Sequence, residues 1–265
     1  MSGPAAGASP FGSVAAPDPV RYMDGAAASG AGRTYKRRLL AALDLSPGLA
    51  VVDVGCGPGT DLMAMSDLVG SGQGGLVVGV DVDAAMRKEA HDRGAALDCV
   101  WVAAGDAHAL PLRAASVDRV RFDRVLQHLA EPARALAEAR RVLRPGGVLG
   151  MAEPDWYTLV VDDPDQVTSD AFTRFVADKV RNGAIGRKLA RLASEAGFAL
   201  RTVDATAVLY RDPADAEQIL GLRRNLARAV AAGAVDEAAG ERWLARTQAG
   251  PTLASFTFYA VTAAA

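Results

Sequence analysis

The sequence contains few of the residues on which metal centres, disulfide frameworks and nucleic-acid interfaces depend. Its 265 residues include two cysteines and three histidines, and Cys56 and Cys99 form neither a metal-ligand spacing nor a disulfide framework. No basic run is present, and a net charge of −2 gives no electrostatic reason to expect a nucleic-acid partner. We therefore expect no metal site and no nucleic-acid partner.

Long apolar runs are missing as well. No uninterrupted apolar stretch approaches the ~20 residues that span a bilayer, and the N-terminus lacks a charged region followed by an apolar one. The sequence therefore predicts a cytoplasmic protein with no membrane span, and the sparse cysteines fit a reducing compartment. Residues 1–18 are mainly Ala, Gly, Ser and Pro, which predicts a flexible tail ahead of a single domain at 19–265.

The alternation of apolar segments predicts an α/β fold. Strands that alternate with helices form a parallel sheet with helices on both faces, and such sheets bind ligands at the carboxyl ends of the strands. The expected helices lie near 33–45, 60–69, 83–94, 131–143, 165–180, 186–196, 213–231 and 234–247. The last two expected strands lie near 199–210 and 253–261.

The most informative stretch is 51–61, VVDVGCGPGTD, where a short apolar strand ends in three alternate glycines. Gly55, Gly57 and Gly59 have no Cβ, so the backbone can adopt positive φ and a ligand can lie against the peptide groups. The helix that follows presents free N–H groups to the bound molecule. Alone, this pattern fits a simple strand-to-helix turn as well as it fits a binding site.

Two later strands end in carboxylates. The segment 76–81 ends in Asp81, about one β-α-β unit after the glycines, where an acid accepts the hydroxyls of a ribose. The segment 100–106 ends in Asp106, which can accept the exocyclic amine of an adenine or, equally, cap the turn that follows.

A glycine turn, a ribose acid and an adenine acid in this order resemble the class I S-adenosylmethionine (SAM)-dependent methyltransferases. The segments 116–129 and 141–149 agree with the later landmarks of that family, and the resemblance covers about 48–152. It is strongest for the small-molecule branch that includes the ubiquinone and menaquinone C-methyltransferases and bacterial secondary-metabolite enzymes. A NAD-type site fits less well because the third glycine falls one residue early for Gly-x-Gly-x-x-Gly.

The resemblance implies a Rossmann-like, doubly wound sheet of seven strands in the order 3-2-1-4-5-7-6, with the last strand antiparallel. It also implies added N-terminal helices and a helical lid, with lid elements at about 19–45, 154–190 and 213–248. In this interpretation residues 154–158 leave the sheet at its active edge. Loops and excursions of this kind commonly cover a substrate.

The same resemblance implies SAM as the cofactor and assigns residues to it. The expected contacts at the methionine end and the glycine turn are Tyr22, Arg33, Asp53, Gly55, Gly57, Gly59 and Phe122. The expected contacts to the ribose and adenine are Asp81, Val82, Met86, Gly105, Asp106 and Ala107.

Methyl transfer from a sulfonium requires a positioned acceptor and, for a hydroxyl or an acidic carbon, removal of a proton. His128 follows the fourth strand at the active edge, and because imidazole titrates near neutral pH it is the candidate base. The alternative is a histidine that only shapes the turn. Asp155 and Tyr157 are further catalytic candidates, although an acid there can equally cap a turn or pair with Arg121 or Arg124.

The sequence thus predicts a SAM-dependent methyltransferase that acts on an O, N or C atom of a small organic acceptor in secondary metabolism. Three alternatives stay open: a quinone C-methyltransferase, a SAM-binding enzyme of pericyclase type that transfers no methyl, and a binding module without turnover. The charged segment 121–124 indicates either an ion-pair network or a charged acceptor. A homodimer is compatible with the sequence.

Overall fold

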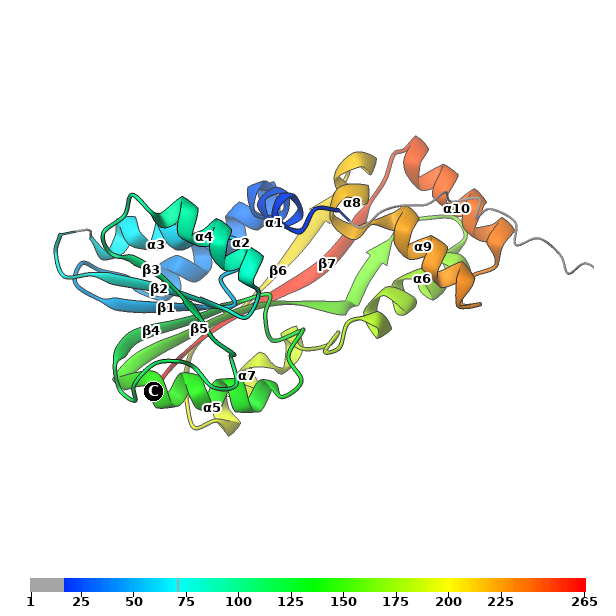
Figure 1. Cartoon of the computed structure of the whole chain (residues 1–265). Helices are drawn as coiled ribbons and strands as arrows, with labels where there is room; N and C mark the ends of the chain where they lie inside the picture. Colours follow the sequence, from blue (N-terminus) through cyan, green and yellow to red (C-terminus); the bar gives the residue numbers. More distant parts are fainter. Residues whose placement is uncertain (1–16, 71) are drawn as a thin grey trace, which may run out of the picture.

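A computed structural model describes residues 17–70 and 72–265, so that most of the predicted tail at 1–18 lies outside the described residues. In the described part, one seven-stranded sheet has the order β3-β2-β1-β4-β5-β7-β6, which confirms the predicted order (Figure 1). The strands are β1 (Ala50–Val54), β2 (Leu76–Asp81), β3 (Val100–Ala104), β4 (Val117–Asp123), β5 (Leu143–Val161), β6 (Ala199–Tyr210) and β7 (Ala254–Ala264).

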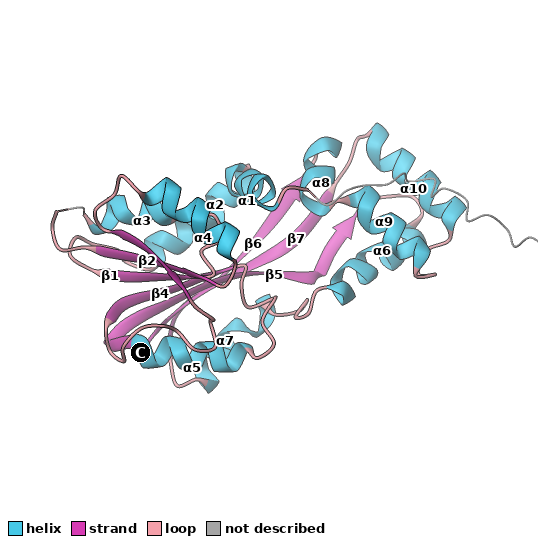
Figure 2. Ribbon diagram, viewed as in Figure 1, coloured by secondary structure: helices cyan, strands magenta, loops and turns pink. Residues whose placement is uncertain are grey.

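Strands β1 to β5 pair in parallel, and β7 pairs antiparallel with both β5 and β6, as expected. The helices are α1 (Pro19–Ala28), α2 (Gly30–Ala42), α3 (Leu62–Val69), α4 (Ala84–Gly94), α5 (Pro132–Val142), α6 (Gln166–Lys179), the 3₁₀ turn η1 (Gly186–Lys188), α7 (Leu189–Glu195), α8 (Pro213–Leu220), α9 (Leu222–Ala231) and α10 (Glu237–Ala249). Helices α2, α3 and α4 cover one face of the sheet and α5 and α7 cover the other, which makes it doubly wound (Figure 2). No helix of the described residues combines the length and apolarity that a bilayer crossing needs.

The prediction that 154–158 leaves the sheet was wrong. Strand β5 continues through this segment to Val161, pairing Asp155 with Thr257 and, after an irregularity, Val160 with Ser255 of β7. Pro154 does not end the strand. It follows the last pair between β4 and β5, and from there β5 has a free edge on the β4 side, where a missing N–H is tolerated. As a result, β5, β6 and β7 project well beyond the shorter strands (Figure 1).

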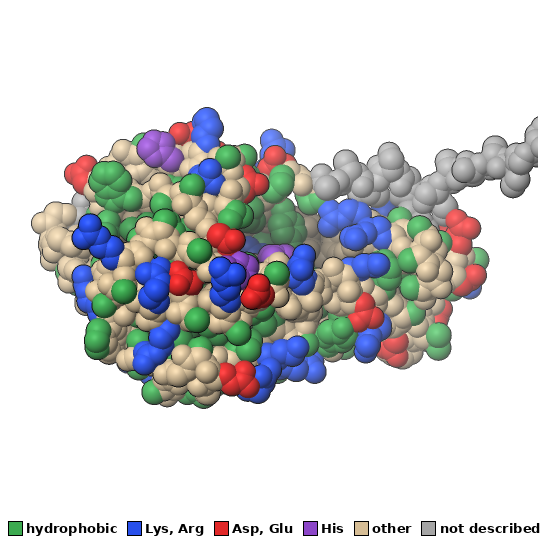
Figure 3. Space-filling model, turned by 60° about the horizontal axis from the view of Figure 1, so that its bottom comes forward, with side chains coloured by type: hydrophobic (Ala, Val, Ile, Leu, Met, Phe, Trp, Pro, Cys, Tyr) green, Lys and Arg blue, Asp and Glu red, His purple; other side chains and the backbone are tan. Residues whose placement is uncertain are grey.

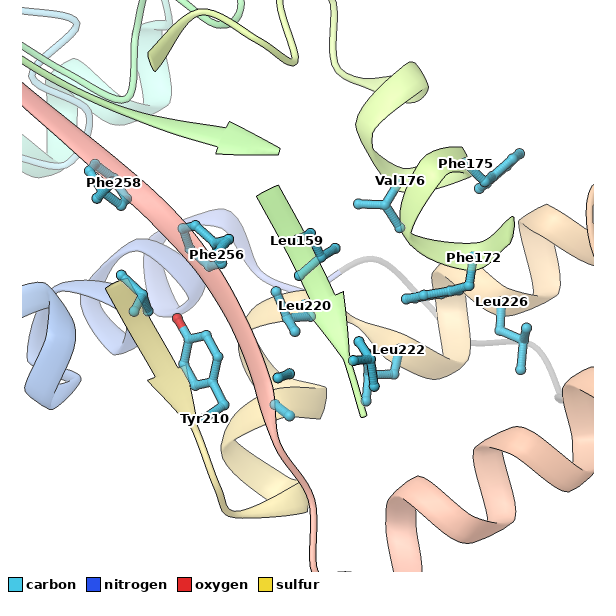
Figure 4. Close-up of a cluster of buried hydrophobic side chains, with 14 of the residues drawn as sticks. Leu159, Phe172, Phe175, Val176, Tyr210, Leu220, Leu222, Leu226, Phe256 and Phe258 are labelled. Carbon is cyan, nitrogen blue, oxygen red and sulfur yellow. The ribbon is translucent and has the colours of Figure 1, made fainter. Parts of the chain in front are cut away.

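Helices α6, α8, α9 and α10 pack around these projecting strands. Figure 4 shows the apolar side chains that fill the space between them, with Leu159, Phe172 and Phe256 facing one another. Trp243 of α10 is fully buried, and its indole donates a 2.8 Å hydrogen bond to Ser169 Oγ of α6. Two of the three segments predicted as lid elements, 154–190 and 213–248, therefore contribute to a second apolar core at the far end of the same sheet.

Glu153 lies on β5 between the two cores and is fully buried. Its Oε1 accepts hydrogen bonds from the backbone N–H groups of Val125 (2.7 Å) and Leu126 (2.6 Å), whereas its Oε2 has no partner among the described residues. Burial raises the pKa of Glu153 to about 8, and the two backbone donors counter this only in part. The carboxyl group is therefore mostly protonated in the folded protein at neutral pH.

This protonation predicts a pH-dependent effect of Glu153→Gln. As pH rises from the ordinary pKa of 4.5 to about 8, the unfolded chain releases a proton that the folded chain retains, so the wild type loses stability. The glutamine variant lacks this loss. We expect the two unfolding free energies to diverge between pH 5 and 8, by roughly 3–4 kcal/mol, and to run parallel well above pH 8.

The measurement is thermal or denaturant unfolding of both proteins across pH 5 to 9. Glu241→Gln is the matched control, because Glu241 is exposed on α10. A stability difference between the Glu153→Gln variant and wild type that does not change with pH would contradict the prediction.

Candidate active site

The glycine turn between β1 and α3 has the backbone geometry that a ligand-binding turn requires. Gly55, Gly57 and Gly59 adopt φ values of 70°, 55° and 79°, in the left-handed region that favours glycine. Two of these glycines also serve packing. A Cβ on Gly55 would lie 2.5 Å from the side chain of Val125, and one on Gly59 would lie 3.0 Å from Ala90.

Gly57 faces the space beside the turn, and helix α1 covers that space. A Cβ on Gly57 would lie 3.0 Å from Sδ of Met23. Asp24 fastens α1 there, because it forms two 2.9 Å hydrogen bonds with Arg93 of α4 and accepts one of 3.2 Å from Thr60. The cavity that remains beside the turn measures about 40 Å³, and it is lined by Met23 of α1 and by the charged residues at the ends of β1 and β4.

Four of the predicted cofactor residues share one open edge of the sheet. Asp81 accepts hydrogen bonds of 2.9 Å from the N–H groups of Gly57 and Asp83. Asp106 accepts one of 2.8 Å from the N–H of His108, and this bond together with the imidazole lowers the pKa of Asp106. The other two are Val82, which is exposed, and Met86 in the first turn of α4.

Three predicted cofactor residues face protein instead. Phe122 is completely buried in the core beneath the sheet, because its neighbour Arg121 takes the face on which Asp53 lies. Ala107 is buried in the same core, and a Cβ on Gly105 would lie 2.6 Å from Pro111. Their expected contacts with the cofactor have no geometric support.

The two N-terminal candidates lie apart. Arg33 is on the outer side of α2, where its guanidinium donates to the carbonyl of Ala28, and it lines a groove between α2 and α3. Tyr22 of α1 points into a larger cavity, with its hydroxyl 3.4 Å from the carbonyl of Ile219.

The charged segment at the end of β4 contains an ion-pair network. Arg121 is 1 % exposed and donates to Asp53 (2.7 Å), Asp61 (2.7 Å) and Asp123 (2.5 Å). Lys36 of α2 contacts Asp61 and donates to Asp123 at 2.6 Å. The network lies directly beneath the glycine turn, and it already engages the carboxylate of Asp53.

Burial and the nearby cations have opposite effects on the pKa values of the carboxyl groups in this network. Burial raises the pKa of Asp53 to about 6, despite its ion pair with Arg121. For Asp61 and Asp123 the effect of burial is outweighed by the charges of Arg121 and Lys36, so their pKa values lie below the ordinary range. Both are carboxylates at neutral pH.

A cavity of about 370 Å³ adjoins the glycine turn on the side of β4 and β5. Its walls are mainly apolar and aromatic, and Figure 3 shows the molecular surface hollowed between its two ends. Tyr35 stacks on Phe258 with ring centres 4.1 Å apart, and Trp156 packs against Phe256 at 5.0 Å. The aromatic lining residues are Tyr22, Tyr35, Trp156, Tyr210, Phe256 and Phe258, and the polar ones include Asp123, Arg124, Gln127 and His128.

His128 lies in the turn after β4 and lines this cavity. Partial burial, followed by the charge of Arg124, lowers the pKa of His128 from its ordinary 6.5, so the imidazole is neutral at pH 7. Nearby, Gln127 accepts a 2.8 Å hydrogen bond from the indole of Trp156, which fixes that wall. The structure therefore places a neutral imidazole at the cavity next to the glycine turn.

Asp155 and Tyr157 point away from the cavity, because side chains alternate along β5 and Pro154 and Trp156 take the cavity face. Asp155 is buried in an ion pair with Arg187, and Tyr157 donates a 2.5 Å hydrogen bond to Asp178. These contacts give both side chains structural partners and no access to the cavity.

Several cavity residues were missed in the sequence. Tyr210 closes β6, and Phe256 and Phe258 alternate along β7, so the two-residue spacing on the last strand was a usable signal. Tyr35 and Lys36 carried no such signal, because their role depends on how α2 crosses the sheet.

The comparisons with known proteins agree with this geometry. Residues 52–151 match the model of a methyltransferase domain family. An uncharacterized 37.1 kDa protein in transposon TN4556 of Streptomyces fradiae is 52 % identical over 95 % of this chain and 72 % of that protein. The ubiquinone/menaquinone biosynthesis C-methyltransferase UbiE of Acidiphilium cryptum is 37 % identical over 44 % of this chain and 47 % of its own length. The chain thus matches about half the length of that enzyme.

Solved structures share the fold. A geranyl diphosphate C-methyltransferase from Streptomyces coelicolor, in complex with S-adenosyl-L-homocysteine, has a TM-score of 0.55 and 17 % identity, with coverage of 88 % of this chain and 76 % of that one. The [4+2]-cyclase SpnF has a TM-score of 0.58 and 21 % identity over 88 % and 81 % of the two chains. These likenesses concern the fold, whereas the match of residues 52–151 to the methyltransferase family and the identity with the C-methyltransferase relative, together with the glycine turn, show that the chain belongs to the class I SAM-dependent methyltransferases, whose cofactor is SAM.

Proposed function

We propose that this enzyme transfers the methyl group of SAM to an O, N or C atom of a small, largely apolar acceptor held in the 370 Å³ cavity. The observation that carries the proposal is that one cavity touches both the glycine turn, at Gly55, and the imidazole of His128. The volume falls within the ~300–1,000 Å³ of common small-molecule sites. When bound, SAM supplies an electrophilic methyl group on its sulfonium.

The cavity walls orient the acceptor and exclude water from it. The stacked pair Tyr35–Phe258 and the pair Trp156–Phe256 present rigid aromatic faces, which favour flat or apolar ligands. His128 serves as the general base, because its lowered pKa leaves Nδ1 or Nε2 free to accept a proton from the acceptor at neutral pH.

The cofactor is held by the open edge of the sheet. Asp81 accepts the ribose hydroxyls and Asp106 the adenine amine, while Val82 and Met86 flank the base. The hydrogen bond from Gly57, which places the carboxylate of Asp81 beside the glycine turn, and the exposure of Val82 support the assignment. Asp53 orients the glycine turn through Arg121 and does not bind the cofactor amine directly.

Two other activities share the same cofactor site. A quinone C-methyltransferase fits the apolar cavity, and it is one case of the proposed activity. An enzyme that binds SAM without transferring its methyl, as a pericyclic catalyst, has the fold likeness to the cyclase in its favour and no specific residue of this site.

The deciding experiment incubates the purified protein and SAM with a library of phenols, quinones, amines and carboxylic acids. The proposal predicts stoichiometric S-adenosylhomocysteine and a product heavier by one methyl group, detected by mass spectrometry. Conversion of an acceptor with SAM left intact would instead establish the non-methylating activity.

The ribose assignment predicts weaker cofactor binding in Asp81→Asn. Loss of charge-assisted hydrogen bonds costs ~1–3 kcal/mol, so SAM affinity in calorimetry should fall about 5- to 150-fold. Asp67→Asn, an exposed change on α3, should bind like wild type. Wild-type affinity in the Asp81→Asn variant would remove this residue from the cofactor site.

The base assignment predicts that His128→Gln keeps SAM affinity within a few-fold and lowers kcat by roughly 10²–10⁴. The wild-type rate should rise with pH through an apparent pKa below 6.5, because only the neutral imidazole accepts a proton, and this inflection should vanish in the variant. His91→Gln, on the exposed side of α4, is the control. Turnover of the His128 variant within about tenfold of wild type would exclude the base role.

A further inference from the structure

Arg124 lines the cavity and has no role in the proposed methyl transfer. Its neighbours in the sequence are paired, because Asp123 accepts from Arg121, Lys36 and the hydroxyl of Tyr35. Among the described residues, by contrast, the guanidinium of Arg124 donates no hydrogen bond and forms no ion pair. Its donors line the cavity.

The backbone at this position is unusual as well. Arg124 has φ of 60°, a left-handed conformation that costs a residue with a Cβ on the order of 1 kcal/mol. Its N–H donates a 2.9 Å hydrogen bond to the carbonyl of Ala152 on β5, which holds the turn in place. The tight turn directs the chain out of β4 at the cavity, where a long cationic side chain lines the wall.

The charges of Asp123 and Asp61 favour the cationic form of Arg124, but neither carboxylate forms an ion pair or a hydrogen bond with its guanidinium among the described residues. Asp123 already accepts from two cations and a hydroxyl, and much of the surrounding wall is aromatic, with Tyr22, Tyr35 and Tyr210 contributing rings. The guanidinium of Arg124 therefore has hydrogen-bond donors at the cavity without an acceptor among the described residues. An anionic group on a ligand would supply that acceptor.

We propose that the acceptor is an apolar molecule with one anionic group, such as a carboxylate, a phosphate or an ionised phenol, and that Arg124 binds this group. A guanidinium presents a planar set of donors that matches an oxyanion in two-point contact. The inference rests on the proposed function, since it names the class of acceptor for that site. Arg124 also lines the small cavity at the glycine turn, so the carboxylate of SAM is the other anion within its reach.

The test compares two fluorescent probes of nearly the same shape, 8-anilinonaphthalene-1-sulfonate, which is an apolar anion, and N-phenyl-1-naphthylamine, its neutral counterpart. We expect Arg124→Gln to weaken binding of the sulfonate at least tenfold and to change binding of the neutral amine less than twofold. Arg124→Lys should restore a large part of the sulfonate affinity. Arg191→Gln, an exposed arginine paired with Glu195, is the matched control.

Calorimetry with SAM on the same proteins separates the two anions. The proposal expects SAM affinity in Arg124→Gln within threefold of wild type. Unchanged sulfonate binding, or an equal loss for both probes, would overturn it, and so would a loss of SAM affinity with sulfonate binding intact, which would assign Arg124 to the cofactor. A wild-type protein that binds the sulfonate through Arg124 but does not bind SAM would refute the proposed function and leave the anion site standing.

Discussion

The cofactor half of the molecule depends on the ion pairs that the guanidinium of Arg121 forms. It joins Asp53 on β1, Asp61 at the start of α3 and Asp123 on β4, and Lys36 ties α2 into the same cluster. A buried ion pair adds little net stability, but removal of one partner leaves an uncompensated charge that costs ~3–5 kcal/mol. The network therefore fixes the relative positions of four elements around the glycine turn. The loss of one charged member removes an ion pair from each of its partners.

The strand order was predictable because the sequence resembles a known family. The position of the glycine turn and of Asp81 at the end of β2 was predictable because glycine spacing and strand-terminal acids are local signals. The sequence was insufficient wherever the face of a side chain depended on strand register. Phe122 faces the core because Arg121 faces Asp53, and Asp155 points away from the cavity because Trp156 points into it. A shift of one residue along a strand exchanges the two faces, and only the pairing partner fixes that register.

The 370 Å³ cavity and the second apolar core share their walls. Tyr35, Tyr210, Phe256 and Phe258 line the cavity and belong to the cluster that packs beneath α6 and α8 to α10. The extension of β5 to Val161 makes this possible, because it continues the sheet past the glycine turn, where the sheet borders both the cavity and the second core. Substitutions that enlarge the cavity therefore also remove buried apolar area, so the size of the cavity and the stability of the fold are not independent in this protein.

Helix α1 belongs to both halves of the site, which couples them mechanically. Met23 covers Gly57 at the glycine turn, while Tyr22 and Ala26 of the same helix line the 370 Å³ cavity. The ion pair between Asp24 and Arg93 ties this helix to α4. A movement of α1 away from the glycine turn would therefore break that ion pair and open one wall of the cavity at the same time.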